Sequence, residues 1–391
     1  MGNTPNVRFK GFTEDWEQRK FSDIAARESS ISTSTTDVPS VEYEDVIAEE
    51  GRLNKDIHLK EAVKSGITFD GSQVLYGKLR PYLHNWLNPD FKGIAVGDWW
   101  VLKPINMDKK FLYRLIQTQQ FDNIANQSSG SKMPRADWNL ISNSEFMVPF
   151  SKAEQSKIGR YFDSLDHLIT LHQQKCDETK EFKKYMLQNM FPQKDEKVPK
   201  IRFDGFTEDW EQRKVSEMFK VTRGYVLPAT DTSQEMTDEM PYPVYSSQTK
   251  DNGLMGYYSD YLYEDAITWT TDGANAGTVN FRDGKFYCTN VCGVLLSDKI
   301  ETSKVIAEAL NNVAKRYVSY VGNPKLMNNV MADIQIAVPI SKRERDQISS
   351  YFSYLDHLIT LHQQKCNALK EFKKYMLQNM FPQKGENKCQ N

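Results

Sequence analysis

The chain has 391 residues, of which 39% are hydrophobic, and its 50 basic and 52 acidic side chains leave a formal net charge of -2. This length is typical of two or three folded domains, and this composition excludes a disordered chain. The sequence has neither a run of about 18 apolar residues nor an apolar stretch near its start, so we expect a cytoplasmic protein without a membrane span, with its five cysteines reduced.

The sequence contains two copies of one unit. Residues 8–20 (RFKGFTEDWEQRK) return with one change as 202–214, and residues 162–194 return as 352–384 with 28 of 33 residues identical. We call 8–20 and 202–214 the GFTEDW motifs. The segments 21–148 and 215–338 that follow them differ greatly in sequence. This repetition indicates that the constant segments do one task twice, whereas the variable segments do related but different tasks.

The first domain is predicted to span residues 1–150. Short runs rich in aromatic and β-branched residues, such as 73–76 and 99–102, predict strands, and 109–124 predicts a helix. Its charge is uneven, because 37–61 is strongly acidic whereas 64–135 holds ten basic and five acidic residues.

Polar and basic residues in the first domain are candidates for DNA contacts. Sequence-specific DNA binding needs side chains that reach base edges and cations that contact phosphates. The candidates are Lys78, Arg80, Tyr82, Ser131, Lys132 and Arg135. The alternative for each is an ordinary solvated surface residue.

Residues 151–191 and 341–384 each predict a long helix. Both begin with a capping-box pattern, Ser151 to Glu154 in the first copy, and both carry apolar residues at heptad spacing, such as Ile158, Phe162 and Leu165. An apolar stripe needs a partner, and the simplest partner is the other copy in the same chain. We expect antiparallel pairing; parallel pairing is the alternative.

Residues 192–214 are predicted to hold a linker and the second GFTEDW motif, residues 215–340 a second domain, and residues 385–391 a frayed tail. The second domain is more acidic, with 10 basic and 15 acidic residues. Its candidates for DNA contacts are Ser247, Gln248, Lys250, Thr271, Asn275, Arg282, Lys325 and Asn328. Tight turns and solvated surface positions are the alternatives.

The predicted fold class is α+β, with two mixed α/β domains joined by two long antiparallel coiled-coil helices in an internal pseudo-two-fold repeat. Identical residues on the two helices suit two copies of one partner. These predicted partner-binding residues are Lys183, Lys184, Tyr185, Lys373, Lys374 and Tyr375. Retention after a recent duplication is the alternative.

Familiar catalytic and metal-binding motifs are absent from the sequence. It has no dinucleotide-binding or P-loop glycine pattern and no H-E-x-x-H, and Cys288 and Cys292 form a lone pair without a second pair at zinc spacing. Two small buried strand residues are the simpler interpretation of this pair. We therefore predict no catalytic residue and no metal site, which favours a binding protein.

The paired GFTEDW motifs, the two divergent domains and the repeated LDHLITLHQQKC segment resemble the specificity subunit of type I restriction–modification systems over essentially the whole chain. The resemblance implies that each variable domain is a target recognition domain for one half of a bipartite double-stranded DNA site. It implies that the repeated helices set the spacing and dock two methyltransferase subunits and, through them, restriction subunits. Adenine N6 methylation with S-adenosylmethionine, and ATP- and Mg-dependent cleavage, would then belong to those partners, with no cofactor on this chain.

Two other functions remain open from the sequence. A coiled-coil scaffold that tethers two protein-binding domains would explain the helices and the acidic domains, but not the GFTEDW motifs. An enzyme with an unrecognised site in each variable domain is the second alternative.

Overall fold

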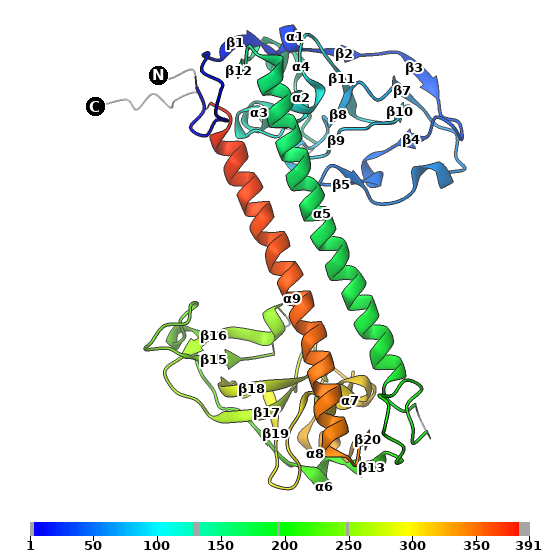
Figure 1. Ribbon diagram of the computed structural model, residues 1–391, viewed down its shortest axis with the longest axis vertical. Helices are drawn as coiled ribbons and strands as arrows, with labels where there is room; N and C mark the ends of the chain where they lie inside the picture. Colours follow the sequence, from blue (N-terminus) through cyan, green and yellow to red (C-terminus); the bar gives the residue numbers. More distant parts are fainter. Residues whose placement is uncertain (1–3, 128–132, 194–195, 248–249, 383–391) are drawn as a thin grey trace. The chain divides into compact units, whose positions relative to one another are not determined.

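The computed structural model describes residues 4–127, 133–193, 196–247 and 250–382. The chain divides into two compact units. Unit 1 comprises Met1–Gln173 and Gln363–Asn391, and unit 2 comprises Gln174–His362. Each unit contains one variable segment and parts of both long helices, α5 (Lys152–Asn189) and α9 (Lys342–Asn379) (Figure 1). The predicted tail, 385–391, lies outside the described residues.

The variable segment of unit 1 contains two sheets. Their strand orders are β3-β7-β10-β4 and β2-β11-β8-β9. The strands are β2 (Ala25–Glu28), β3 (Ile31–Thr33), β4 (Ser40–Val41), β7 (Ser65–Phe69), β8 (Val74–Gly77), β9 (Trp86–Leu87), β10 (Gly93–Ala95) and β11 (Trp99–Pro104). The predicted strands at 73–76 and 99–102 are β8 and β11, which pair with each other antiparallel.

Short helices complete unit 1. They are α1 (Phe21–Ile24), α2 (Lys109–Leu115), α3 (Gln119–Ala125) and α4 (Trp138–Asn143), and a small ribbon pairs β5 (Val46–Ile47) with β6 (Arg52–Leu53). The helical segment predicted for 109–124 is present, divided into α2 and α3. Thr118 caps the start of α3, where its hydroxyl accepts a hydrogen bond from the Phe121 N–H.

Unit 2 is built on one sheet with the order β14-β19-β17-β18-β15-β16. The strands are β14 (Lys220–Arg223), β15 (Tyr242–Tyr245), β16 (Leu254–Tyr258), β17 (Tyr263–Thr270), β18 (Val279–Cys288) and β19 (Cys292–Leu296), with helices α6 (Val215–Met218), α7 (Lys304–Ala314) and α8 (Asn328–Asp333). Cys288 and Cys292 are buried free thiols, at the end of β18 and at the start of β19. Burial raises the pKa of the Cys292 thiol to about 11, which suits a packing role.

The two GFTEDW motifs end in strands that tie each variable segment to a long helix. In unit 1, β1 (Glu17–Lys20) pairs antiparallel with β12 (Glu145–Val148), directly before α5. In unit 2, β13 (Glu211–Lys214) pairs in the same way with β20 (Gln335–Val338), directly before α9.

A buried glutamate in the first turn of each long helix binds the GFTEDW motif. Glu154 is 1% exposed and accepts hydrogen bonds from the Arg8 guanidinium at 2.7 and 2.8 Å and from the Trp16 indole N–H at 3.3 Å. The capping-box pattern assigned this glutamate to the helix N-terminus, but its carboxylate binds residues from the start of the unit instead.

The same arrangement occurs in unit 2. Glu344 accepts hydrogen bonds from Arg202 at 2.7 and 2.9 Å and from the Trp210 indole N–H at 3.2 Å. Its backbone N–H also donates to the Ser341 hydroxyl at 3.5 Å, so part of the expected cap is present here. We call Arg8, Trp16 and Glu154, and their counterparts Arg202, Trp210 and Glu344, the glutamate clamps.

Within each unit the two helix segments run antiparallel. In unit 1, the Cys366 thiol contacts the Ile169 carbonyl at 3.9 Å and Lys373 pairs with Asp166 at 2.7 Å, so residue numbers rise on one helix as they fall on the other. In unit 2, the Cys176 thiol contacts the Ile359 carbonyl at 3.8 Å. The heptad residues Ile158, Phe162, Leu165, Ile169 and Cys176 are all buried.

We predict that Glu154→Gln destabilises the protein by about 3 kcal/mol, because it leaves the Arg8 guanidinium partly buried without a counter-ion. Glu344→Gln should have a similar effect through Arg202. Urea denaturation measures the free energy of unfolding. The control is Glu181→Gln, at an exposed position of α5, which should cost less than about 0.5 kcal/mol. Equal stability of the Glu154 and Glu181 variants would contradict the clamp.

Candidate nucleic-acid interface

In unit 1, two stretches of predicted DNA-contacting residues lie side by side. Residues 78–82 follow β8, and residues 133–136 precede α4. The Arg80 N–H donates to the Pro134 carbonyl at 2.7 Å, and the Ala136 N–H donates to the Lys78 carbonyl at 2.8 Å. These two backbone hydrogen bonds hold the stretches together as one loop pair.

Asp98 neutralises two of the predicted cations in this loop pair. Its carboxylate lies 3.5 Å from the Lys78 ammonium and 3.0 Å from the Arg135 guanidinium, and Arg135 lowers the pKa of the Asp98 carboxyl. The Arg135 side chain is nevertheless 53% exposed, and so is about half of Tyr82. Both side chains can therefore contact a bound partner without a change in the backbone of unit 1.

Unit 2 forms the same loop pair from different residues. The Leu326 N–H donates to the Thr271 carbonyl at 2.8 Å, and the Gly273 N–H donates to the Pro324 carbonyl at 2.9 Å. The Lys325 ammonium lies 3.4 Å from the Asp272 carboxylate, and the Lys325 side chain is 52% exposed. Lys325 thus occupies the place in unit 2 that Arg135 occupies in unit 1.

The other candidates of unit 2 have different environments. Asn275 lies half-buried in the loop after β17, and Asn328 begins α8. Thr271 donates its hydroxyl within the unit, to Asp272 or to the Val291 carbonyl. Ser247 is half-buried, and Lys250 begins a 3-10 turn (Lys250–Gly253). Ser131, Lys132 and Gln248 lie outside the described residues.

Arg282 differs most from its prediction, because it is buried in unit 2. It is 7% exposed, donates to the Thr268 hydroxyl at 3.1 Å and to the Asn252 carbonyl at 2.7 Å, and lies 3.7 Å from the centre of the Tyr245 ring. Burial lowers the pKa of this guanidinium. The contacts give Arg282 a role in fixing the turn between β15 and β16.

Exposed apolar residues near the loop pairs were not among the predicted contacts. Met133 in unit 1 is 51% exposed, and Tyr320, Val321 and Met327 in unit 2 are 71%, 93% and 58% exposed. The sequence held one signal that pointed to this region. A proline followed by a cation, Pro134-Arg135 and Pro324-Lys325, stands at the same distance before the last strand of each unit.

The predicted partner-binding residues fall into two groups. Lys184, Tyr185, Lys374 and Tyr375 are exposed on the long helices. Lys183 and Lys373 instead form ion pairs inside their units. Lys183 lies 2.7 Å from Asp356 in unit 2, as Lys373 lies 2.7 Å from Asp166 in unit 1. These two lysines join the paired helix segments.

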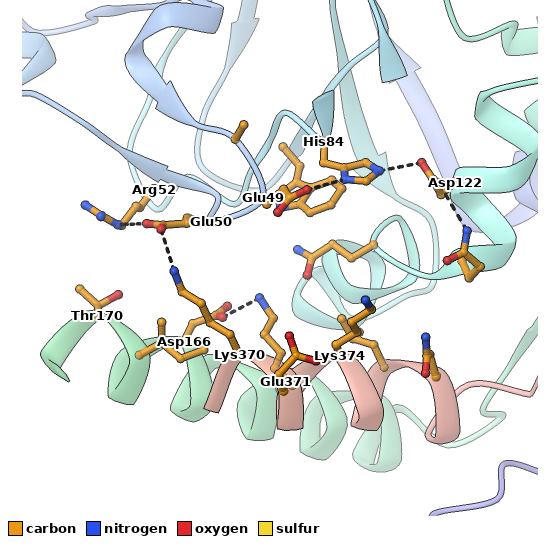
Figure 2. A pocket seen from close by; sticks show the side chains of 18 of the residues that line it. Glu49, Glu50, Arg52, His84, Asp122, Asp166, Thr170, Lys370, Glu371 and Lys374 are labelled. Atoms are coloured by element: carbon orange, nitrogen blue, oxygen red, sulfur yellow. Dashed lines mark hydrogen bonds and ion pairs between the residues drawn. The ribbon is translucent and has the colours of Figure 1, made fainter. Parts of the chain in front are cut away.

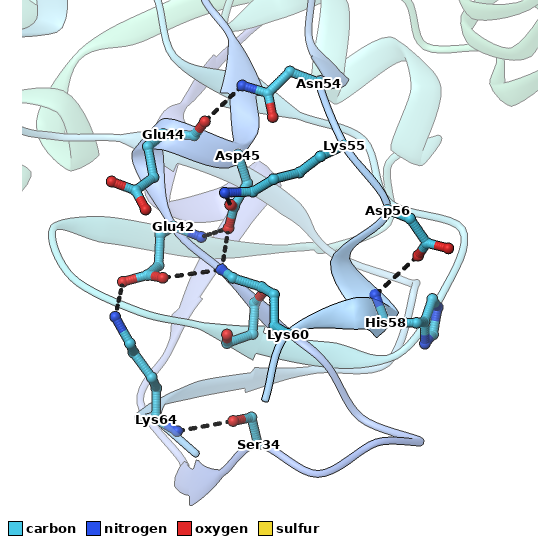
Figure 3. A network of polar contacts seen from close by, with 11 residues as sticks. Ser34, Glu42, Glu44, Asp45, Asn54, Lys55, Asp56, His58, Lys60 and Lys64 are labelled. Atoms are coloured by element: carbon cyan, nitrogen blue, oxygen red, sulfur yellow. Dashed lines mark hydrogen bonds and ion pairs between the residues drawn. The ribbon is translucent and has the colours of Figure 1, made fainter. Parts of the chain in front are cut away.

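Part of the acidic stretch of unit 1 is neutralised locally (Figure 3). Asp45 is fully buried, and its carboxylate binds Lys55 at 2.8 Å and Lys60 at 2.6 Å. Glu42 binds Lys60 at 2.9 Å and Lys64 at 2.7 Å. Hydrogen bonds from both lysines lower the pKa of the Glu42 carboxyl, with Lys64 contributing most. Glu42 and Asp45 are therefore neutralised locally, in part by Lys64 just beyond the acidic stretch.

The loop after β8 ends at His84. The ring of His84 contacts carboxylates from two other segments of unit 1. Its Nε2 atom lies 2.9 Å from the Asp122 carboxylate on α3, and its Nδ1 atom lies 3.3 Å from Glu49. The Asp122 hydrogen bond is the main cause that raises the pKa of His84. Both Glu49 and His84 have left-handed backbones, with φ of 64° and 53°.

Among the described residues, no group of three or more His, Cys, Asp or Glu side chains could hold a metal ion. Within the same part of the chain, no helix is both long and apolar enough to span a membrane.

One protein family has a sequence model that matches most of the chain. The family model for the type I restriction modification DNA specificity domain matches residues 13–181 and 207–371. Each match covers one variable segment and part of the helix that follows it.

Curated relatives from Mycoplasma pneumoniae cover parts of the chain. A putative type I specificity subunit N-terminus is 36% identical over 140 residues, which are 35% of this chain and 73% of that protein. Another putative type I specificity subunit is 29% identical over 192 residues, or 48% of this chain and 67% of that protein. The specificity subunit of the type I restriction enzyme MpnII is 38% identical over 100 residues, or 25% of this chain and 30% of that protein.

Two solved structures share the fold at low sequence identity. The S subunit of a type I restriction–modification system from M. genitalium is 14% identical, with a TM-score of 0.71, and the match covers 98% of this chain and all of that one. A chain from a study of complex assembly and conformational transition of the type I system is also 14% identical, with a TM-score of 0.51 and coverage of 93% and 96%.

We predict that His84 stabilises the protein in a pH-dependent way. Because its pKa is raised in the folded state, this stabilisation is complete below the unfolded value of about 6.5 and is lost as the pH rises through the folded value. The stability difference between the wild type and His84→Gln, about 1 kcal/mol at pH 6, should therefore shrink toward pH 9.

Denaturant unfolding at several pH values measures this difference. The control is His167→Gln, on an exposed position of α5. A difference that stays constant or grows as the pH rises would contradict the assignment.

Proposed function

The chain belongs to the family of type I restriction–modification DNA specificity domains, and from this membership we propose that it reads one bipartite DNA site, with each variable segment reading one half. The observation that carries this proposal is the loop pair that recurs in both units with different side chains. Arg135 and Lys78 stand at the loop pair of unit 1, and Lys325 and Thr271 at that of unit 2. A shared backbone with different side chains suits two readers of different sequences.

The exposed cation of each loop pair is suited to DNA. Arginine and lysine are the commonest donors to guanine and also contact phosphates. The carboxylates of Asp98 and Asp272 hold these cations in place, and bound DNA would compete with them for the same donors. The net charge of -2 does not attract the negative DNA backbone, so partner subunits would supply further phosphate contacts.

The long helices are proposed to form an antiparallel coiled coil that sets the distance between the two half-sites. Each has 38 residues, about 57 Å at 1.5 Å per residue. The antiparallel pairing of helix segments within each unit supports this idea. A rigid connector of fixed length would keep an unread spacer of fixed length, as dimer geometry fixes half-site spacing elsewhere.

We place the chemistry on partner subunits. Two methyltransferase subunits would dock on the helices and methylate adenine N6 with S-adenosylmethionine, and restriction subunits joined through them would use ATP and Mg. The exposed, repeated residues Lys184, Tyr185, Lys374 and Tyr375 are the docking candidates that remain at the surface.

The proposal predicts that Arg135→Ala and Lys325→Ala each weaken recognition of a different half-site. Each loss should be about 1–3 kcal/mol, or roughly 5- to 150-fold in affinity. The affinity of the assembled complex for duplexes altered in one half at a time measures the effect.

Lys365→Ala, on an exposed position of α9 outside the loop pairs, is the control and should bind as the wild type does. If both loop variants impaired the same half-site, or if neither changed binding, the assignment of one half-site to each unit would be refuted.

A further inference from the structure

Arg80, in the loop pair of unit 1, has a strained backbone. Its φ of 49° and ψ of 66° place it in the left-handed region. Residues other than glycine seldom adopt this conformation, and Pro81 makes it rarer still, because a residue before proline is normally extended. Strain of this kind persists only where the surrounding contacts impose it, and it is concentrated at functional sites.

Backbone hydrogen bonds impose the strained conformation. The N–H groups of residues 78–80 all have partners outside this stretch of the loop. They donate in turn to the Asp98 carbonyl at 2.9 Å, the Tyr43 hydroxyl at 3.0 Å and the Pro134 carbonyl at 2.7 Å. The backbone that carries the Arg80 side chain is therefore fixed by three consecutive contacts.

The far end of the same loop is also fixed. His84 follows a 3-10 turn (Pro81–Leu83), and its ring contacts the Asp122 carboxylate at 2.9 Å and the Glu49 carboxylate at 3.3 Å (Figure 2). Because both ends of the loop are anchored, the position of Arg80 is set before a ligand binds. A donor that is held in advance loses little conformational entropy on binding.

The Arg80 guanidinium is left without a partner. Among the described residues, its side chain forms no hydrogen bond or ion pair. The Asp98 carboxylate binds the other two cations of the loop pair, Lys78 at 3.5 Å and Arg135 at 3.0 Å. Arg80 is partly exposed, and of its three guanidinium nitrogens only Nε is both buried and without an acceptor. A ligand cannot reach Nε, so the donors available to it are the two terminal nitrogens.

Unit 2 has the same backbone position without a side chain. The Gly273 N–H donates to the Pro324 carbonyl, as the Arg80 N–H donates to the Pro134 carbonyl, and Gly273 is also left-handed, with φ of 94°. A Cβ atom placed on Gly273 would have no atom other than those of its chain neighbours within 4 Å, so this position faces open space. Since glycine forms the same turn without strain, the loop pair does not require an arginine here.

We propose that Arg80 reads a guanine in the half-site of unit 1, with its two terminal nitrogens donating to guanine O6 and N7. This inference rests on the proposed function and adds a base-reading residue to it. The planar guanidinium matches these two acceptors in the major groove, and this is the commonest specific contact between proteins and DNA. Unit 2 has Gly273 at this position and makes no such contact from it.

Selection by the assembled complex from duplexes randomised over the site tests the proposal. Arg80→Gly should accept any base at one position where the wild type requires guanine, and should keep its other preferences. On the wild-type site it should bind roughly 5- to 150-fold more weakly. A duplex with 7-deazaguanine at that position lacks the N7 acceptor. It should bind the wild type about tenfold more weakly and Arg80→Gly without further loss.

Two further variants separate recognition from stability. Arg80→Gln retains part of the side-chain stem but not the guanidinium, and it should lose the same guanine preference. Asn106→Gly is the control, because Asn106 is exposed in unit 1 with the same φ of 49° but lies outside the loop pair. It should change no base preference. In urea, Arg80→Gly should unfold at a concentration no lower than Arg80→Gln, because glycine relieves the left-handed strain.

Four results would overturn the proposal. Weaker binding of Arg80→Gly to every duplex, with unchanged base preferences, would identify a phosphate contact instead. Unchanged binding would leave Arg80 without a role in recognition. Loss of the same guanine preference in Asn106→Gly would show that it does not depend on Arg80 alone. A lower urea midpoint for Arg80→Gly than for Arg80→Gln would remove the argument from strain.

These results are distinguishable from failure of the proposed function. In all four, the wild-type complex still selects a bipartite sequence. A wild-type complex that selects no sequence would refute the proposed function itself, and the role of Arg80 with it.

Discussion

A buried carboxylate in the first turn of each long helix is the interaction on which both units depend. Moving a charge out of water is expensive unless a partner of opposite charge and good geometry is present. Glu154 meets that condition because Arg8 binds both of its oxygens and Trp16 donates to one of them. The Trp16 ring also packs edge-on against Phe381, which follows α9, so one motif joins both helix segments of unit 1. Trp210 contacts Phe191 in the same way in unit 2.

This arrangement separates a constant framework from changeable loops. The clamps and the first strand of each pair beside them, β1 and β13, recur in both units with the same residue types, and the two long helices share most of their sequence. The loop pairs after β8 and β17 keep their backbone hydrogen bonds but differ in side chains. The side chains of the loop pairs can therefore differ between the units while these shared parts stay the same, which fits the great difference between the two variable segments.

Local periodicity made the long helices and several strands predictable from the sequence. The glutamate clamp was not, because Arg8 and Glu154 are 146 positions apart and the local pattern at Glu154 also matches a helix cap. Lys183 and Lys373 were predicted at the surface for a similar reason, since their carboxylate partners lie on the other helix. Arg282 was predicted as exposed because no local pattern indicates that the Tyr245 ring covers it.

The most direct test of the central claim is to replace residues 21–148 with the corresponding segment of another family member and to determine which DNA sequences the assembled complex recognises. If each variable segment reads one half of the site on a shared framework, the recognised sequence should change in one half and stay the same in the other. A change in both halves, or in neither, would contradict the account.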